Sequence, residues 1–153
     1  MVKYVKASLD APEARFAIVA SIYNERVTAG LTSGALAALE VAGAKNVTVY
    51  VTPGAFEMPL TVKKLAASGR YDAIICVGSV IKGQTYHFEV ISDSVVHAIQ
   101  QVALETGIPV TLGLLTAYDR TQALKRSGAE KNKGAEAAFA AVGMVDLLRQ
   151  AGS

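Results

Sequence analysis

The sequence predicts an α/β fold, a single three-layer domain in which a central four-stranded parallel sheet carries helices on both faces. Apolar runs of strand length alternate along the chain with segments whose apolar residues recur at helical spacing. The runs are continuously apolar, as expected for parallel strands that are buried on both faces. At 153 residues the chain is large enough for one domain with its own core, so we expect residues 1–153 to form a single domain.

The first two strand–helix units are predicted between residues 16 and 66. Residues 16–20 are continuously apolar, which favours a central strand, and residues 27–39 then follow a helical period that ends near Gly43, a plausible C-cap. Residues 47–51 are rich in β-branched side chains, which favours a second strand. A Pro-Gly pair ends this strand, and a second helical pattern begins at Met58.

Two further units and a closing helix follow. Residues 73–77 form the third apolar run, and a helical pattern begins after Thr85. Residues 110–115 predict the fourth strand, residues 119–126 a short helix, and residues 134–148 the last helix.

Residues 1–14 precede this regular alternation. Apolar residues alternate at Val2, Tyr4 and Ala7, and Pro12 follows. This pattern predicts an N-terminal arm or an edge strand. The sequence does not identify the partner of such a strand.

Composition and charge narrow the classes of partner. The chain has 15 basic and 13 acidic residues, and its net charge of +2 is too small to predict nucleic acid, so we expect small-molecule partners. The single cysteine, Cys76, lies inside an apolar run and is interpreted as a small core residue. A hydrophobic fraction of 52% and a mean hydropathy of +0.34 are high for a small soluble domain, which predicts an oligomer.

The sequence also predicts a cytoplasmic location. No uncharged apolar stretch approaches the ~20 residues that a membrane helix needs. The N-terminus lacks the apolar centre of a signal peptide. We therefore expect no membrane partner.

Residues 77–89 concentrate the groups with recognisable chemistry. They lie where the third strand passes into a helix, and a glycine and a hydroxyl residue before a helix allow backbone N–H groups and the helix dipole to bind an anion. Gln84 and Thr85 are therefore a predicted phosphate site. His87 is the candidate for proton transfer, because an imidazole exchanges protons near neutral pH.

Ligands of an open parallel sheet bind beyond the carboxyl ends of its strands, so the loops that follow the strands form the candidate site. These loops span residues 22–24, 53–57, 78–85 and 116–118. The first contains no glycine for a flavodoxin's phosphate loop, and the first and third lack the acidic residues of a phospho-receiver domain. The sequence has no dinucleotide-binding glycine motif and no metal-ligand cluster, so no redox cofactor and no metal is expected.

Four segments, taken together, resemble the lumazine synthase family. They are SIYN (21–24), PGAFEMP (53–59), VIKGQTYHF (80–88) and NKGAEAA (132–138), in the family's order and at nearly its spacing. The resemblance covers the chain from about Phe16 onward. It implies a flavodoxin-like strand order and the penultimate step of riboflavin biosynthesis. In that step 5-amino-6-(D-ribitylamino)uracil condenses with 3,4-dihydroxy-2-butanone 4-phosphate, and no cofactor is required.

The resemblance implies roles for individual residues. Tyr23 matches the aromatic residue that stacks on the pyrimidine, and His87 matches the histidine that transfers protons. Contacts to the ring and the ribityl chain are implied for Ala55, Phe56, Glu57, Ser79, Val80 and Ile81. Phosphate binding is implied for Gln84, Thr85 and Arg126, the arginine coming from a neighbouring subunit, and Lys133 and Glu136 match further residues near that site.

The chain departs from the family pattern in three places. Tyr23 replaces the commoner Phe or Trp, which adds a hydroxyl without removing the stacking face. Leu112 stands where the family often has an aromatic residue over the substrate, so we expect a differently shaped wall there. The loop at residues 128–134 is one residue shorter than in many relatives. Family members are pentamers, some of which build an icosahedral shell, and the resemblance also implies an association with riboflavin synthase. The sequence leaves the choice between pentamer and shell open.

Other interpretations of these residues were weighed. Without the resemblance, a histidine that begins a helix is more often a surface or capping residue than a catalytic one. The basic residues between 125 and 133 are most simply a solvated helix end. The alternative function is a catalytically weak relative that carries or stores flavin or lumazine, and the presence of both His87 and Arg126 favours the enzyme.

Overall fold

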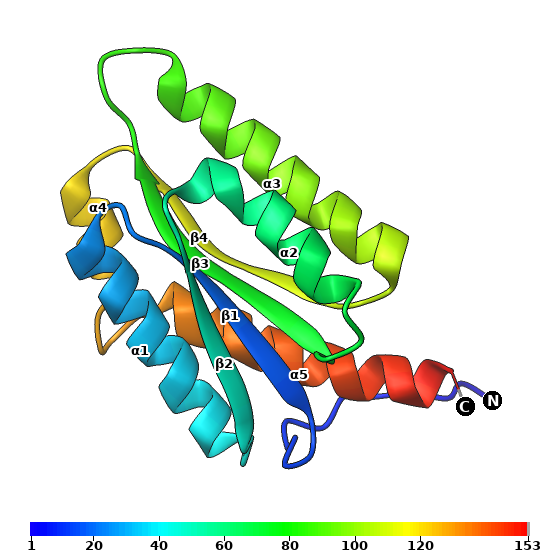
Figure 1. The fold of residues 1–153 in the computed structure, drawn as a ribbon. Coiled ribbons are helices and arrows are strands. Elements are labelled where there is room, and N and C mark those ends of the chain that lie inside the picture. The colour runs from blue at the N-terminus through cyan, green and yellow to red at the C-terminus, as the bar shows by residue number, and fades with distance from the viewer. Residues whose placement is uncertain (153) are drawn as a thin grey trace.

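The computed structural model describes residues 1–152 and contains a four-stranded parallel sheet (Figure 1). The strands are β1 (Arg15–Ser21), β2 (Asn46–Thr52), β3 (Ala73–Ile81) and β4 (Val110–Ala117). Their order across the sheet is β2-β1-β3-β4, and every neighbouring pair is parallel. The predicted α/β class, the parallel sheet and its four strands are confirmed.

Helices cover both faces of the sheet. The helices α1 (Glu25–Val41) and α5 (Lys133–Ala151) pack on one face, and α2 (Met58–Ala66) and α3 (His87–Thr106) pack on the other (Figure 1). Two short helices, the 3₁₀ turn η1 (Ala55–Glu57) and α4 (Arg120–Lys125), lie in the connections after β2 and β4. The three predicted layers are therefore present.

The central strand β3 explains why its sequence is continuously apolar. Ile75 and Val77 belong to the core beneath α1 and α5, whereas Ile74 and Cys76 belong to the core beneath α2 and α3. Successive side chains of a strand point to opposite faces, so burial on both faces removes any apolar–polar alternation. Cys76 is fully buried, as expected for a core residue, and burial raises the pKa of its thiol to about 12.

One predicted boundary is wrong. The apolar run predicts a third strand that ends at residue 77 and a loop over residues 78–85, but β3 continues to Ile81. Pairing with β4 continues as far as Ile81 opposite Ala117, and the Lys82 amide then donates to the Ala117 carbonyl at 2.9 Å. Long-range pairing thus overrides the low strand propensity of Gly78. Only residues 82–86 remain as the loop before α3.

The remaining elements lie close to their predicted positions, and the first residues form an arm. Residues 1–14 contain no strand in the described chain, so an edge strand is not formed within this chain's own sheet. The arm is held to α5 by Ser8, whose amide donates to Asp146 Oδ2 at 2.7 Å, and by Gln150, whose Nε2 donates to the Lys6 carbonyl at 3.0 Å.

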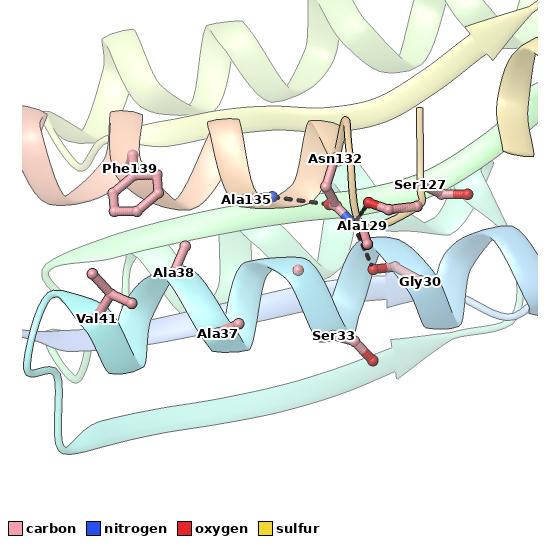
Figure 2. Close-up of a pocket in the computed structure, with 12 residues that line it drawn as sticks. Gly30, Ser33, Ala37, Ala38, Val41, Ser127, Ala129, Asn132, Ala135 and Phe139 are labelled. Carbon is pink, nitrogen blue, oxygen red and sulfur yellow. Dashed lines mark hydrogen bonds between the residues drawn. The ribbon is translucent and has the colours of Figure 1, made fainter. Parts of the chain in front are cut away.

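The helices α1 and α5 approach closely because small residues face each other (Figure 2). A Cβ atom on Gly134 would lie 2.0 Å from the Leu31 carbonyl oxygen, so only glycine fits there without separating the helices. Asn132 caps α5 by accepting from the Ala135 amide at 3.1 Å, and its Nδ2 donates to the Gly30 carbonyl at 2.9 Å. One asparagine thereby begins α5 and binds it to α1.

We expect Gly134→Ala to lower the free energy of unfolding by about 1–3 kcal/mol, because the new methyl group overpacks the contact with backbone of α1. The matched control is Gly143→Ala in the same helix, where a Cβ atom would meet its nearest neighbour at an ordinary 3.5 Å. That control should be neutral or stabilising by up to about 1 kcal/mol through helix propensity. Urea unfolding at one protein concentration measures both, and equal effects would contradict the packing argument.

The amino ends of β1 and β3 are joined by an ion pair. The Asp72 carboxylate accepts from the Arg15 amide at 2.7 Å and from Arg15 Nη2 at 3.1 Å. Burial raises the pKa of Asp72, but the hydrogen bonds and the charge of Arg15 outweigh burial and hold this pKa below its ordinary value. The ionised carboxylate therefore stabilises the fold above its unfolded-state pKa, and this contribution is lost as pH falls through the folded-state pKa.

Asp72→Asn should therefore destabilise the protein most near neutral pH. The difference in free energy of unfolding between wild type and variant should shrink as pH falls from about 6 to about 3, because the wild-type carboxylate becomes protonated. Urea unfolding across this pH range measures the difference. A difference that stays constant would show that the charge of Asp72 contributes nothing.

Candidate active site

A cavity of about 380 Å³ lies beyond the carboxyl ends of β1, β2 and β3. Eight predicted site residues line it: Tyr23, Ala55, Phe56, Glu57, Ser79, Val80, Ile81 and His87. A larger cavity of about 540 Å³ lies between α1 and α5, is lined mainly by small residues and contains no predicted site residue (Figure 2). Segments separated by up to 68 positions in the chain, from Tyr23 to Ile91, thus converge where a parallel sheet binds its ligands.

The loop after β1 is fixed by Asn24. This residue has φ 55° and ψ 52°, the left-handed conformation that asparagine tolerates better than most residues. Its side chain does not cap α1 but donates from Nδ2 to the Ser79 carbonyl at 2.9 Å. Asn24 therefore links the end of β1 to the end of β3 beside the cavity.

The loop after β2 brings η1 over the sheet. Gly54 is buried, and a Cβ atom there would lie 2.9 Å from Glu57 Oε2 and 3.0 Å from Tyr23 Cε2. Thr52 holds this turn by donating from its hydroxyl to the Gly54 carbonyl at 3.0 Å. The missing side chain of Gly54 thus allows Tyr23 and Glu57 to approach each other at the mouth of the cavity.

The end of β3 leaves backbone groups free on one side. Pairing with β1 ends at Val77, opposite Ala20, whereas pairing with β4 continues to Ile81. The Ser79 carbonyl, which accepts from Asn24, points to the β1 side. Because alternate residues of a strand direct their backbone groups to the same side, Ile81 presents its N–H and carbonyl there as well. A planar ligand with donors and acceptors can pair with this edge.

The start of α3 supplies His87 and Ile91, which lie one helical turn apart and line the same cavity. The His87 side chain is exposed in the single chain. Gln84 and Thr85 lie in the short loop immediately before it, are exposed and do not line the cavity. Tyr23 and Phe56 expose 67% and 65% of their surface, so two aromatic rings stand open at the cavity. Exposed rings of this size are available for stacking.

Four predicted residues lie away from this cavity: Leu112, Arg126, Lys133 and Glu136. Leu112 stands on β4 opposite Cys76, well before the end of the strand. The other three form a separate group at the junction of α4 and α5. The Lys133 amide donates to the Arg126 carbonyl at 2.8 Å, and Lys133 Nζ lies 3.1 Å from Glu136 Oε2. One chain therefore carries two separate groups of predicted site residues.

The sequence analysis did not single out three residues that line the cavity: Asn24, Gly54 and Ile91. Asn24 and Gly54 lie within the quoted motifs. The signal for Asn24 was a residue type that tolerates left-handed backbone, and the signal for Gly54 was a residue type that allows close approach of neighbouring groups. The signal for Ile91 was its helical spacing of four from His87.

Within residues 1–152, no group of three or more histidine, cysteine, aspartate or glutamate side chains is arranged to hold a metal ion. No helix in that part of the chain combines the length and the apolar character that crossing a bilayer requires.

Comparison with known proteins decides the family. Residues 13–149 match the model of the family described as 6,7-dimethyl-8-ribityllumazine synthase. The chain belongs to this family. It is 48% identical over 139 residues to the 6,7-dimethyl-8-ribityllumazine synthase of Syntrophus aciditrophicus, which covers 89% of this chain and 90% of the relative. It is 44% identical over 152 residues to that of Chlorobium phaeobacteroides (strain DSM 266), covering 97% and 98%.

A third relative extends the similarity. The 6,7-dimethyl-8-ribityllumazine synthase of Thermococcus gammatolerans is 42% identical over 136 residues, which covers 89% of this chain and 88% of the relative. The resemblance seen in the sequence motifs is therefore confirmed at the level of the family. All the residues that line the cavity lie inside the matched range of 13–149.

Substitutions of Asn24 should separate its two roles. Asn24→Gly keeps the left-handed backbone but loses the hydrogen bond to Ser79, which should cost about 1 kcal/mol of stability. Asn24→Ala loses the hydrogen bond and also strains the backbone. The strain should lower stability by a further amount of about 1–2 kcal/mol, the penalty for holding a non-glycine residue in the left-handed conformation. Urea unfolding measures both. Equal stabilities of the two variants would contradict the backbone role.

Proposed function

We propose that this chain condenses 5-amino-6-(D-ribitylamino)uracil with 3,4-dihydroxy-2-butanone 4-phosphate to form 6,7-dimethyl-8-ribityllumazine, phosphate and water. The observation that carries this proposal is the cavity itself, in which residues of three separate family motifs meet at the carboxyl ends of the strands. The reaction must align two substrates and move several protons. Alignment of reactants can lower such a barrier by roughly 7 kcal/mol or more.

The uracil substrate is assigned to the open edge of β3. The N–H of Ser79 and the N–H and carbonyl of Ile81, which face the side that β1 leaves open, match a ring with donors and acceptors, and the exposed ring of Tyr23 can stack on its face. Phe56 and Glu57 on η1 lie at the cavity where the ribityl chain would extend. A carboxylate accepts hydrogen bonds from hydroxyl groups, which suits the ribityl chain.

The butanone phosphate is assigned to the loop at residues 82–86 and the start of α3. Backbone N–H groups at the beginning of α3 favour an anion, and Gln84 and Thr85 precede them. His87 lies between this anion site and the uracil site, where it can relay protons during imine formation, phosphate loss and ring closure. General acid–base catalysis of this kind contributes typically about 100-fold or more.

A neighbouring copy of the chain completes the site. Arg126, Lys133 and Glu136 lie together but away from the cavity of their own chain, as expected if they serve the cavity of the next subunit. Large apolar side chains are exposed on α2 and α3, namely Leu60, Val90 and Leu104, and subunit contacts would cover them. We propose a pentamer, alone or as the unit of a shell, with Leu112 forming part of the adjoining wall.

The test is lumazine formation, followed by absorbance, with wild type and Arg126→Ala. The variant should raise KM for the butanone phosphate by about 10- to 100-fold, because charge-assisted hydrogen bonds to phosphate are lost. Its turnover rate should recover in part at high concentrations of the butanone phosphate. The matched control is Arg120→Ala, an exposed arginine on the same helix, which should leave KM unchanged. No turnover by folded, oligomeric wild type would contradict the enzyme and favour a flavin- or lumazine-binding container.

A further inference from the structure

The loop at residues 82–86 is closed by an ion pair between residues on either side of it. We propose that Lys82 and Glu89 are positioning residues, which hold this loop in the conformation that binds the phosphate of the butanone substrate. The inference rests on the proposed function, because it assigns the task of the pair within that site.

The pair joins the sheet to α3 across the loop. Lys82 Nζ lies 2.8 Å from Glu89 Oε1. The Lys82 backbone is fixed to β4, since its amide donates to the Ala117 carbonyl at 2.9 Å, and Glu89 lies in the first turn of α3. Gln84, Thr85 and His87 all lie between the two paired residues, so the pair sets the separation of the loop's ends.

The surroundings hold the pair in one arrangement. Lys82 Nζ also lies 5.8 Å from the centre of the Tyr118 ring, and this ring lies 6.1 Å from the ring of Phe88, which is buried. Glu89 Oε2 is buried and accepts no hydrogen bond from another residue of the described chain. The side chains of Lys82 and Glu89 are 44% and 29% exposed, so water screens their charges in part, and the short contact restrains the loop mainly through its geometry. The hydrogen bond from Lys82 lowers the pKa of Glu89, which favours the ionised form.

Apart from this ion pair, few contacts restrain residues 82–86. Residues 82–87 are all exposed in the described chain. The hydrogen bond from the His87 amide to Thr85 Oγ1 is long, at 3.5 Å. A loop with few contacts samples several conformations, and ordering it on binding weakens affinity. Loss of the pair should therefore weaken phosphate binding, while the uracil contacts on β1, η1 and β3 stay in place.

A competing explanation is that Lys82 binds the phosphate directly through its charge. The two explanations predict opposite signs for Glu89→Gln. This variant removes a negative charge near the phosphate and releases Lys82, so direct binding predicts tighter phosphate binding. Positioning predicts weaker binding, because the loop loses its closure. The sign of the change therefore distinguishes them.

The experiment compares wild type with Glu89→Gln, Lys82→Met, the double variant and Lys82→Arg. We expect Glu89→Gln to raise KM for the butanone phosphate by roughly tenfold, with less than about a twofold change for the uracil, because a displacement of the loop costs alignment. The double variant should raise KM for the butanone phosphate by no more than the more impaired single variant does, because each substitution removes the same interaction. Lys82→Arg should restore most of the affinity. Calorimetric titration with inorganic phosphate should show the same order of affinities.

The matched control is Glu105→Gln, which breaks the pair of Lys63 and Glu105 at the other end of α3, where the atoms are 3.9 Å apart. It should leave both KM values unchanged. Unchanged or tighter phosphate binding by Glu89→Gln would overturn the inference. The inference would also be overturned if Glu89→Gln raised both KM values equally and lowered the thermal midpoint, because that result indicates a purely structural role. If wild type forms no lumazine, the proposed function fails. The phosphate titration alone then shows whether the ion pair of Lys82 and Glu89 positions the phosphate-binding loop.

Discussion

The site depends on an asymmetry in the hydrogen bonding of β3. This strand pairs with β4 along its whole length to Ile81 but with β1 only to Val77. Beyond Val77, β3 is therefore hydrogen-bonded to β4 on one side, while its backbone groups on the other side need other partners. Asn24 satisfies one carbonyl of the open side, and the rest faces the cavity. A rigid strand with unused backbone groups is a preorganised surface for a planar polar ligand.

This asymmetry needs support from both layers of helices. On one face, Gly134 lets α5 approach α1 until it contacts the backbone at Leu31, and Asn132 fixes the two helices to each other. On the other face, α2 and α3 cover the buried side chains of Ile74 and Cys76. The two layers bury β3 as far as Ser79, so they hold the strand up to the point where its open edge begins. The edge itself opens because β1 ends at Ser21.

The structure also divides the chemistry between rigid and weakly held parts. The residues proposed to contact the uracil lie at strand ends and on a short helix, whereas those proposed to bind phosphate lie on an exposed loop that one ion pair closes. The group formed by Arg126, Lys133 and Glu136 is separate from both. Such a division suits a reaction in which one substrate loses its phosphate, because the part that releases phosphate can move without disturbing the part that holds the ring.

The sequence alone determined the α/β class, the four strands, the core position of Cys76 and eight of the eleven residues that line the cavity. Periodicity and composition are local properties, and the family motifs are short contiguous segments, so both can be recognised in one dimension. Only the tertiary structure decided that β3 continues through Gly78 to Ile81 and that Asn24 links β1 to β3. Each of these depends on pairing or packing between residues distant in the chain, and the energies of such contacts override local propensity.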